Sequence, residues 1–345
     1  MRLYDENGYI NIRAVRDTGY PFILLNGGRG TGKTYGALRT SVEDGKRFMF
    51  MRRRQTQVDI INKPQFSPMK PVCRDTGLQI TTAPVAKGLA AFVPYETDEK
   101  GKTIITGDPY GYTCALSTVA NLRGFDASEL DMIIYDEYIP EKTERPLPHE
   151  ADALFNCYET MNRNRELDGR PPMQLLCLSN TNDQTAPVLE SLHLISRIDK
   201  MKKSGQDVYT DPVRGLMLIL LKDSPISAAK SDTALYRLTA GSDFSRMALE
   251  NAFAYEDRGA IVSRPLAEYR PLVQVGEIVI YKHKSARRYY VSTHKAGSPP
   301  SFGTSDSDLE RFRHAFGWLW EVYLRELVEF EEYLCQILLT KYLAW

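Results

Sequence analysis

The sequence has few cysteines, no excess of charge of either sign and no long apolar run. Its five cysteines are odd in number and widely spaced, without a Cys-x-x-Cys pair, so we expect reduced thiols and neither a disulfide framework nor a zinc site. Lysine plus arginine and aspartate plus glutamate both total 44, so a polyanion would have to be bound by a local basic patch. No stretch approaches the length of about eighteen apolar residues typical of a membrane span, and the first residues lack the apolar core of a signal peptide. We therefore expect a cytoplasmic protein with no membrane partner.

The motifs that define a GTPase are also missing. The acidic strand end described below is not followed by Asp-x-x-Gly, and the nearest candidate for an Asn-Lys-x-Asp guanine motif is Asn62-Lys63-Pro64-Gln65. Guanine specificity is therefore not expected.

A phosphate-binding loop is the most informative segment that is present. Gly27–Thr34 fits Gly-x4-Gly-Lys-[Ser/Thr], follows the apolar run Phe22–Leu25 and precedes the helix-compatible residues 35–40. Glycines let successive N–H groups surround a pyrophosphate, Lys33 would bridge the β- and γ-phosphates of ATP, and the Thr34 hydroxyl would bind Mg²⁺. The residues expected to contact the nucleotide in this loop are Gly28, Arg29, Gly30, Thr31, Gly32, Lys33 and Thr34.

An apolar strand that ends in two acids supplies the second half of a nucleotide site. Asp136 and Glu137 directly follow the run Met132–Tyr135. The first carboxylate would hold Mg²⁺ through its water shell, and the second would orient and activate the attacking water. Tandem acids therefore favour hydrolysis of ATP by water over a small-molecule kinase.

Two further segments are candidates for sensing and completing the site. Cys177–Asn180 ends a predicted strand in small polar side chains, so Asn180 would lie near the γ-phosphate, unless this is an ordinary Ser/Asn turn. Arg163 follows a helix predicted to start near His149, and an arginine there can reach a neighbouring subunit's γ-phosphate. A solvated charge run is the alternative for Arg163, and Arg165 is the reserve candidate.

The chain is long enough for two domains, and its texture changes along its length. Up to residue 184 short apolar runs recur between helical segments, which predicts a parallel sheet with crossover helices over residues 1–184. The predicted strands are Phe22–Leu25, Phe48–Met51, Tyr112–Leu116, Met132–Tyr135 and Leu175–Leu178. We expect a lid or linker over 185–225 and a smaller α+β domain over 226–345.

Basic residues lie between the second and third predicted strands. Three arginines, 52 to 54, follow Met51, and one of them is expected to face the nucleotide while others face outward. The insertion Lys63–Asp108 adds lysines that could line a polyanion channel. The candidate DNA contacts are Arg53, Arg54, Lys63, Lys87 and Lys102.

The carboxyl-terminal third has its own signals. Glu277–Tyr281 and Arg288–Ser292 predict a hairpin, and Ser307 with Glu310 predicts a capping box at the start of a long helix. An aromatic stripe at helical spacing along that helix is explained by core packing or, alternatively, by docking onto a partner protein. Its members are Phe312, Phe316, Leu319, Trp320, Tyr323 and Leu324.

Taken in order, these motifs resemble those of the DNA-packaging (encapsidation) ATPases of small podoviruses that replicate protein-primed linear genomes, which are related to the large-terminase ATPases. The matching segments are 28–34, Phe48–Arg53, Ile134–Ile139, Arg163–Glu166 and Cys177–Asn180.

The resemblance implies a P-loop fold of the ASCE type and a homomeric, pentameric ring on the portal of a procapsid. Such a ring would drive double-stranded DNA inward with ATP and Mg²⁺ in the host cytoplasm, would be absent from the mature virion, and in some relatives uses a structural RNA. It implies that Glu137 is the catalytic carboxylate, that Asp136 supports the metal, that Arg163 acts in trans, and that Arg29 senses the γ-phosphate or holds Glu137 inactive. It also implies a carboxyl-terminal domain resembling an RNase-H-type nuclease without function, in keeping with a strand 288–294 that offers no carboxylate.

Two other classes of protein stay open from the residues alone. One is a hexameric helicase or AAA+ remodelling ATPase, and the other is a scaffold with a relict nucleotide site. The intact Lys33, Asp136 and Glu137 disfavour the scaffold.

Overall fold

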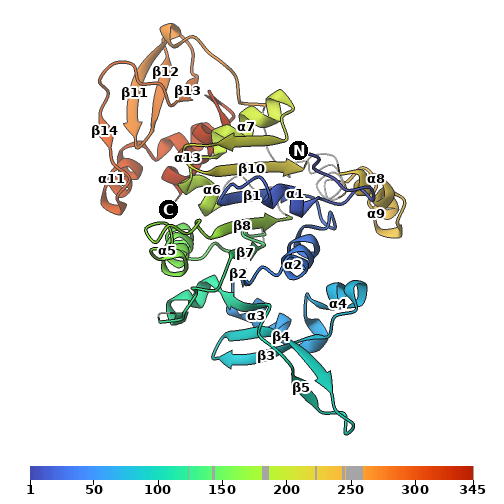
Figure 1. Cartoon of the computed structure of the whole chain (residues 1–345). Coiled ribbons are helices and arrows are strands. Elements are labelled where there is room, and N and C mark those ends of the chain that lie inside the picture. Colours follow the sequence, from blue (N-terminus) through green and yellow to red (C-terminus); the bar gives the residue numbers. More distant parts are fainter. Residues whose placement is uncertain are drawn as a thin grey trace. The chain divides into compact units, whose positions relative to one another are not determined.

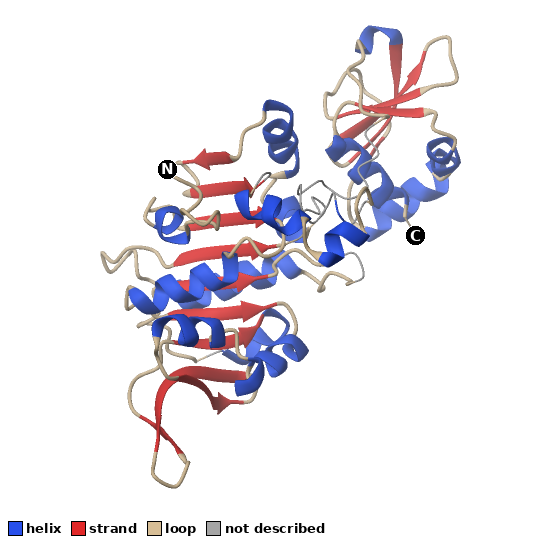
Figure 2. Ribbon diagram, turned by 90° about the vertical axis from the view of Figure 1, so that its right-hand side faces the viewer, coloured by secondary structure: helices blue, strands red, loops and turns tan. Residues whose placement is uncertain are grey.

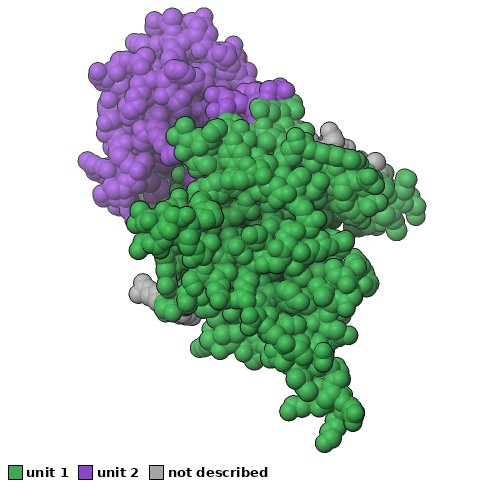
Figure 3. All heavy atoms as spheres, in the orientation of Figure 1, with its two compact units in different colours: residues 1–191, 205–254 green, residues 192–204, 255–345 purple. Residues whose placement is uncertain are grey.

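The computed structural model describes residues 1–122, 124–141, 144–180, 186–221, 224–242, 245 and 259–344. It divides into two units, shown in two colours in Figure 3. The first contains residues 1–191 and 205–254, and the second contains residues 192–204 and 255–345.

A ten-stranded sheet forms the centre of the first unit (Figure 1). Along the sheet the order is β3-β4-β6-β2-β7-β8-β1-β10-β9, with β5 paired to β4. The six strands from β6 to β10 are parallel, and β3, β4, β5 and β9 pair antiparallel at the two ends. The bounds are β1 Phe22–Gly27, β2 Phe48–Arg52, β3 Ile80–Ala86, β4 Leu89–Thr97, β5 Thr103–Ile105, β6 Gly111–Ala115, β7 Met132–Asp136, β8 Gln174–Ser179, β9 Val208–Asp211 and β10 Leu216–Leu221. All five strands predicted from the sequence are present.

Helices cover both faces of the sheet, which is why the central strands are continuous apolar runs (Figure 2). Side chains of α1, α2 and α4 pack on the face that contains Ile23, Leu25, Phe50 and Ile134. The opposite face includes Tyr135, whose hydroxyl donates to Glu150 of α5 at 3.3 Å. The helices of this unit are α1 Ile12–Arg16, α2 Lys33–Glu43, α3 Gln55–Ile61, α4 Lys70–Thr76, α5 Glu150–Asn162, α6 Pro187–Ser191, α8 Pro225–Ser231 and α9 Ala234–Leu238, with 3-10 turns η1 Pro64–Phe66 and η2 Leu116–Leu122.

The structure divides the chain differently from the sequence-based boundaries. The segment 185–225, expected to be a lid or linker, supplies β10, which pairs in parallel with β1 and is buried along its whole length. A six-residue apolar run is typical of a central strand of a parallel sheet, so its place in the core has a clear physical reason. α8 and α9, expected in the carboxyl-terminal domain, group with the first unit, whereas α7 groups with the second.

The second unit is a smaller α+β fold. Its five-stranded sheet has the order β14-β11-β12-β13-β15, and β12 and β13 form the predicted antiparallel hairpin. Helices pack on this sheet through a separate core. Its elements are α7 Ile195–Ser204, η3 Leu266–Glu268, β11 Tyr269–Val275, β12 Ile278–His283, β13 Tyr289–Ser292, β14 Ser301–Phe302, α11 Asp306–Phe316, α12 Trp318–Leu324, β15 Val328–Phe330 and α13 Tyr333–Leu343.

Two details of this unit differ from the sequence-based expectations. The N-cap of α11 is Ser305, whose hydroxyl accepts from the Asp308 amide at 3.2 Å, so the predicted Ser307 cap is wrong by two residues. The aromatic stripe is split: Phe312 and Leu319 are fully buried, whereas Trp320 and Leu324 are exposed.

The Glu331 carboxylate accepts a 2.7 Å hydrogen bond from the hydroxyl of Ser292, the last residue of β13. The residues 288–294 do not predict this carboxylate, because Glu331 lies outside that segment.

None of the described helices has the combined length and apolar character needed to cross a bilayer.

Candidate nucleotide site

The phosphate-binding loop joins the carboxyl end of β1 to the first turn of α2. Gly30 and Gly32 have φ angles of 70° and 86°, which non-glycine residues rarely adopt. Gly27 is required for a different reason, because a Cβ there would lie 2.7 Å from Cβ of Leu221 in the neighbouring strand β10. The loop geometry therefore depends on glycine at each of these three positions.

Lys33 is buried inside the loop, with 4% of its surface exposed. Its Nζ donates to the carbonyls of Gly27 at 3.0 Å and Gly28 at 2.7 Å and to Oγ1 of Thr31 at 3.0 Å. Burial lowers the pKa of the Lys33 ammonium to about 7, with Asp136 opposing the shift and Lys230 adding to it. The lysine is thus held at the loop with its protonation sensitive to a nearby anion.

Thr34, in the first turn of α2, contacts Asp136, at the end of β7, although the two lie far apart in the sequence. Oγ1 of Thr34 donates to Oδ1 of Asp136 at 2.9 Å. Asp136 is 3% exposed, and burial raises its pKa while the Arg52 guanidinium opposes that rise. Oδ2 of Asp136 accepts no hydrogen bond from the described residues, although Nη2 of Arg52 lies 2.9 Å away as an ion pair without hydrogen-bond geometry.

These two side chains suit Mg²⁺. The described residues contain no group of three or more His, Cys, Asp or Glu side chains that could hold a metal by themselves. Mg²⁺ typically uses one or two protein oxygens together with nucleotide phosphates and water, so a hydroxyl beside a carboxylate with a spare buried oxygen is a fitting donor set.

Glu137 lies directly after β7 and is held by an arginine. Its Oε2 forms an ion pair with Nη1 of Arg52, the last residue of β2. Arg52 and Glu137 meet because β2 and β7 are adjacent and parallel, with Met51 opposite Tyr135. One of the three arginines 52 to 54 is expected to face the nucleotide side, and Arg52 is the one that pairs with the two acids at that edge of the sheet. These partners of Arg52 were not predicted.

The backbone of Glu137 is itself unusual. Its φ of 58° places a non-glycine residue in the left-handed region, which costs on the order of 1 kcal/mol or more. The Tyr138 side chain that follows this turn is fully buried, and its hydroxyl donates to Oδ1 of Asn26 at 2.7 Å. Strain concentrated at this position is typical of a functional residue.

The predicted sensor strand, β8, lies between β7, which ends in Asp136, and β1, which leads into the phosphate-binding loop. β8 pairs in parallel with β7 on one side and with β1 on the other. Leu178 is opposite Asp136 and Ser179 is opposite Asn26, so Asn180 follows at the same edge of the sheet as the phosphate loop and the acids. A strand inserted between these two strands is the arrangement of ASCE-type P-loop proteins, as predicted.

Arg29 points to a different partner from the one expected. Its guanidinium forms an ion pair with Glu141, and both side chains are about half exposed. In this structure the residue that holds Glu137 is Arg52, so the predicted pairing of Arg29 with Glu137 is not the one observed. A role for Arg29 at the γ-phosphate stays a prediction.

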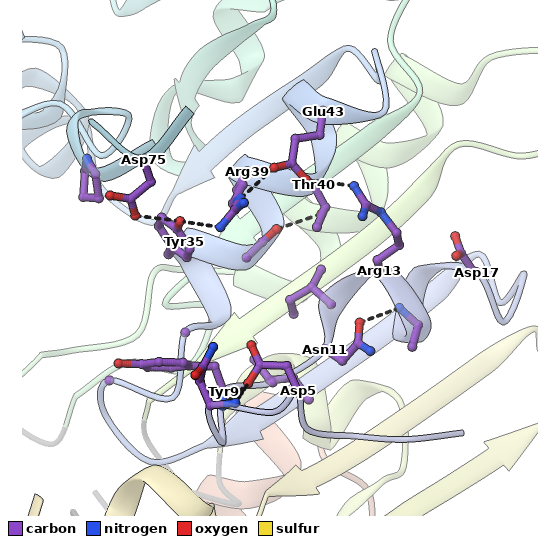
Figure 4. Close-up of a pocket in the computed structure, with 18 of the residues that line it drawn as sticks. Asp5, Tyr9, Asn11, Arg13, Asp17, Tyr35, Arg39, Thr40, Glu43 and Asp75 are labelled. Atoms are coloured by element: carbon purple, nitrogen blue, oxygen red, sulfur yellow. Dashed lines mark hydrogen bonds and ion pairs between the residues drawn. The ribbon is translucent and has the colours of Figure 1, made fainter. Parts of the chain in front are cut away.

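A cavity of about 940 Å³ lies beside the loop, between the amino-terminal segment, α2 and α4 (Figure 4). Tyr9, Tyr35 and Gly32 line it, and the Tyr9 ring lies against Gly32. The Tyr35 hydroxyl donates to Asp75 at 2.8 Å and accepts from Arg39 at 3.0 Å. Sequence reasoning gave no role to the amino-terminal segment, because its short elements carry no motif.

Arg163 lies at the opposite edge of the sheet from its own phosphate loop. It is the C-cap of α5, and its guanidinium donates at 2.8 Å to the carbonyl of Phe125, a residue that precedes the amino end of β7. The predicted helix start near His149 is confirmed by α5. The guanidinium of Arg163 is therefore held far from the phosphate loop of the same chain. The reserve candidate Arg165 is 8% exposed and donates to backbone carbonyls of Leu130 and Pro171, which is a packing role.

The candidate DNA contacts do not form one patch. Arg53 is fully buried and its guanidinium binds Glu150 at 2.7 and 2.8 Å, so as a DNA contact it is wrong for this structure. Arg54 donates to the Arg145 carbonyl at 2.8 Å. Lys63, Lys87 and Lys102 are exposed. Lys87 and Lys102 lie beyond opposite ends of β4, whose nine residues span roughly 30 Å.

Similarities to known proteins agree with this geometry. The family model of the podovirus DNA encapsidation protein (Gp16) matches residues 87–269. Over 245 residues the chain is 26% identical to a DNA packaging protein of Bacillus phage phi29. The aligned part covers 69% of this chain and 64% of that protein, so the chain spans less than two thirds of the relative's length.

Two solved structures share the fold. A chain of the bacteriophage Phi-29 viral genome packaging motor assembly superposes with a TM-score of 0.66 at 16% identity, covering 97% of this chain and 99% of that chain. A chain of the Phi-28 gp11 DNA packaging motor superposes with a TM-score of 0.62 at 17% identity, covering 95% of each. The similarity extends over both units.

Proposed function

Because the chain belongs to the podovirus DNA encapsidation protein (Gp16) family, we propose that it is an ATPase that moves double-stranded viral DNA into a procapsid. The observation that carries the proposal is the convergence of Thr34, Asp136 and Glu137 at one edge of the sheet, with Lys33 next to Thr34 at the start of α2. Thr34 belongs to α2, whereas Asp136 ends β7 and Glu137 follows it directly, so their meeting is a property of the fold.

Each residue has a distinct task in this proposal. Lys33 and the loop amides bind the β- and γ-phosphates, and the cavity beside Tyr9 and Tyr35 receives the base and ribose. Thr34 and Asp136 hold Mg²⁺, which supplies charge neutralisation on the phosphates. Glu137 accepts a proton from the attacking water, and Asn180 hydrogen-bonds near the γ-phosphate.

Nucleotide binding should be coupled to proton uptake at Lys33. Burial lowers the pKa of Lys33 to about 7 in the free site, and a polyphosphate anion raises that pKa. We therefore expect more proton uptake on binding MgATPγS at pH 8 than at pH 6. Titration calorimetry in buffers of different ionisation enthalpy measures both values, and equal uptake at the two pH values would contradict the assignment.

The assembly is proposed to be a homomeric ring, a pentamer, docked on the portal of the procapsid in the host cytoplasm and released before the virion matures. The family membership supports this, and so does the position of Arg163 far from its own site. A structural RNA at the portal belongs to the same proposal. Electron micrographs of procapsids with bound protein, and protein analysis of mature virions, test these points, and a protein retained in virions would contradict the release.

Arg163 is proposed to complete the neighbouring subunit's site. Arg163→Ala should lose most ATP hydrolysis as a homomeric ring, yet mixing it with a Lys33→Ala partner should restore part of it, since each variant supplies what the other lacks. ATPase assays over a range of mixing ratios measure this, with subunit exchange verified by labelled protein. Exchange without any recovery would exclude the trans role. Arg170→Ala, which removes a nearby exposed arginine bound to the Ser128 carbonyl, is the matched control.

Stimulation of the ATPase tests the packaging function itself. Hydrolysis should rise when procapsids and double-stranded DNA are added together, and DNA affinity should fall steeply with salt and show little sequence preference. Charge reversal at Lys63, Lys87 or Lys102 should reduce the DNA-dependent part and leave basal hydrolysis intact. Stimulation by DNA without procapsids, with strand separation, would favour the alternative of a hexameric helicase, and stimulation by protein substrates would favour an AAA+ remodeller.

A further inference from the structure

A second lysine reaches the phosphate loop from a part of the chain that carries no recognised nucleotide motif. Lys230 lies near the end of α8, and its ammonium group donates to the carbonyl of Arg29 inside the loop. The contact is close enough that a Cβ added to Gly30 would overlap with Nζ of Lys230. Glycine at position 30 therefore leaves room for this side chain as well as for the loop's own backbone turn.

The start of α8 is anchored beside the loop through the amino-terminal segment. Ser224 is 4% exposed and its hydroxyl donates to the Gly8 carbonyl at 3.1 Å. Gly8 has a φ of 82°, and a Cβ there would lie 2.8 Å from Cβ of Pro225. One residue later Tyr9 lies against Gly32, and the Ile10 amide donates to the Thr31 carbonyl at 3.0 Å. Residues 8 to 10 thus connect the loop to the beginning of the helix that carries Lys230.

The ammonium groups of Lys33 and Lys230 repel each other electrostatically. Burial lowers the pKa of Lys230, and the charge of Lys230 contributes to the lowered pKa of Lys33. Among the described residues Lys230 forms no ion pair with a carboxylate, so its described partner at the loop is a neutral carbonyl. Two repelling cations at one loop are stabilised by an anion placed between them.

We propose that Lys230 is a phosphate-binding residue that contacts the terminal phosphate of the nucleotide and so links α8 and α9 to the nucleotide state. Gly32 and Lys33, at the amino end of α2, are next to the β-phosphate position, whereas Arg29 and Gly30 lie earlier in the loop, on the side where a third phosphate projects. Lys230 touches that earlier part. It should therefore favour a triphosphate over a diphosphate. This inference rests on the proposed nucleotide binding and adds a residue to the same site.

Binding of MgATPγS and MgADP to the full chain tests the proposal. Lys230→Gln keeps a donor for the Arg29 carbonyl and removes the charge, so it should weaken MgATPγS binding about tenfold or more and MgADP binding less than about threefold. Lys230→Arg should keep the preference. Arg237→Gln, in the adjacent helix α9, removes an exposed cation bound to the Asp232 carbonyl and should change neither affinity.

The outcomes separate the inference from the function on which it rests. If the unaltered protein binds neither nucleotide, the proposed function fails. If it binds both and Lys230→Gln changes them equally, not at all, or towards tighter binding, the role of Lys230 is overturned. Thermal unfolding measures whether each variant is folded. If Lys230→Gln is less folded, the affinities of Lys230→Met, which keeps the aliphatic stem, for MgATPγS and MgADP are measured instead and judged by the same criteria.

Discussion

Replacing Glu137 with glutamine should lower ATP turnover by about 10²–10⁴-fold while leaving nucleotide affinity within a few fold. Glutamine keeps the size of the side chain and a hydrogen-bonding oxygen but cannot take a proton from water. Lys33, Thr34 and Asp136, which bind phosphate and metal in the proposal, are unchanged. Steady-state hydrolysis and MgATPγS binding, measured on the same preparation, separate the two effects.

The matched control is Glu141→Gln. Glu141 lies four residues further on and pairs with Arg29 instead of Arg52, with about half of its side chain exposed. Its loss should leave turnover within a few fold of the unaltered protein. Near-normal turnover in Glu137→Gln, or an equally large loss in Glu141→Gln, would remove Glu137 from the role of base.

The ion pair with Arg52 bears directly on this role. The Glu137 carboxylate is held by the Arg52 guanidinium, whereas a general base must lie within hydrogen-bond reach of the water that it activates. In the proposed reaction Glu137 must therefore leave Arg52, or share it with the nucleotide, to contact that water.

The sequence predicted those parts of the site that depend on neighbouring residues. The loop Gly27–Thr34, the two acids at the end of β7 and the small polar end of β8 are each local patterns, in which the strand, the turn and the functional side chains are neighbours in the sequence. Parallel order then brings the three strand ends to one edge of the sheet. The five predicted strands follow from the same local patterns.

The parts that were missed depend on pairings between distant segments. Arg52 meets Glu137 only because β2 lies beside β7 in one register, and Lys230 meets the loop only because residues 8 to 10 place α8 there. The turn with Pro212 and Gly215 predicts a linker in this part of the chain, and the short apolar run of β10 that follows does not by itself distinguish a core strand. The periodicity of a single segment does not predict such contacts between distant segments.

The adjacent arginines 52, 53 and 54 show how a run of like charges can mislead. Side chains that follow one another at the end of a strand point in different directions, so Arg52 turns to Asp136 and Glu137 while Arg53 turns into the interior. The expected partner of Arg53 is a DNA phosphate, and the observed partners are two carboxylates, those of Glu150 in α5 and of Glu144. A buried arginine with a bidentate carboxylate partner has a structural role.

Removing the charge of Arg53 should strongly destabilise the first unit. Arg53 and Glu150 are both fully buried, joined by bonds of 2.7 and 2.8 Å, and Glu150 also accepts from the Leu147 amide at 2.9 Å. Arg53→Met leaves a buried carboxylate without its counter-charge, which costs about 3–5 kcal/mol of the free energy of unfolding. Denaturant-induced unfolding measures that loss, and Arg54→Gln, which removes only the half-buried neighbour bound to a carbonyl, should cost less than about 1 kcal/mol.

A second substitution distinguishes the buried pair from a general defect at this position. Glu150→Gln removes the uncompensated charge and keeps an oxygen for the Leu147 amide, so the double variant Arg53→Met/Glu150→Gln should be more stable than Arg53→Met alone. The two changes are then strongly non-additive, as expected for groups in direct contact. If Arg53→Met kept its full stability and lost only its affinity for DNA, the guanidinium would have to be available to the phosphate backbone, and the buried pairing with Glu150 would be overturned.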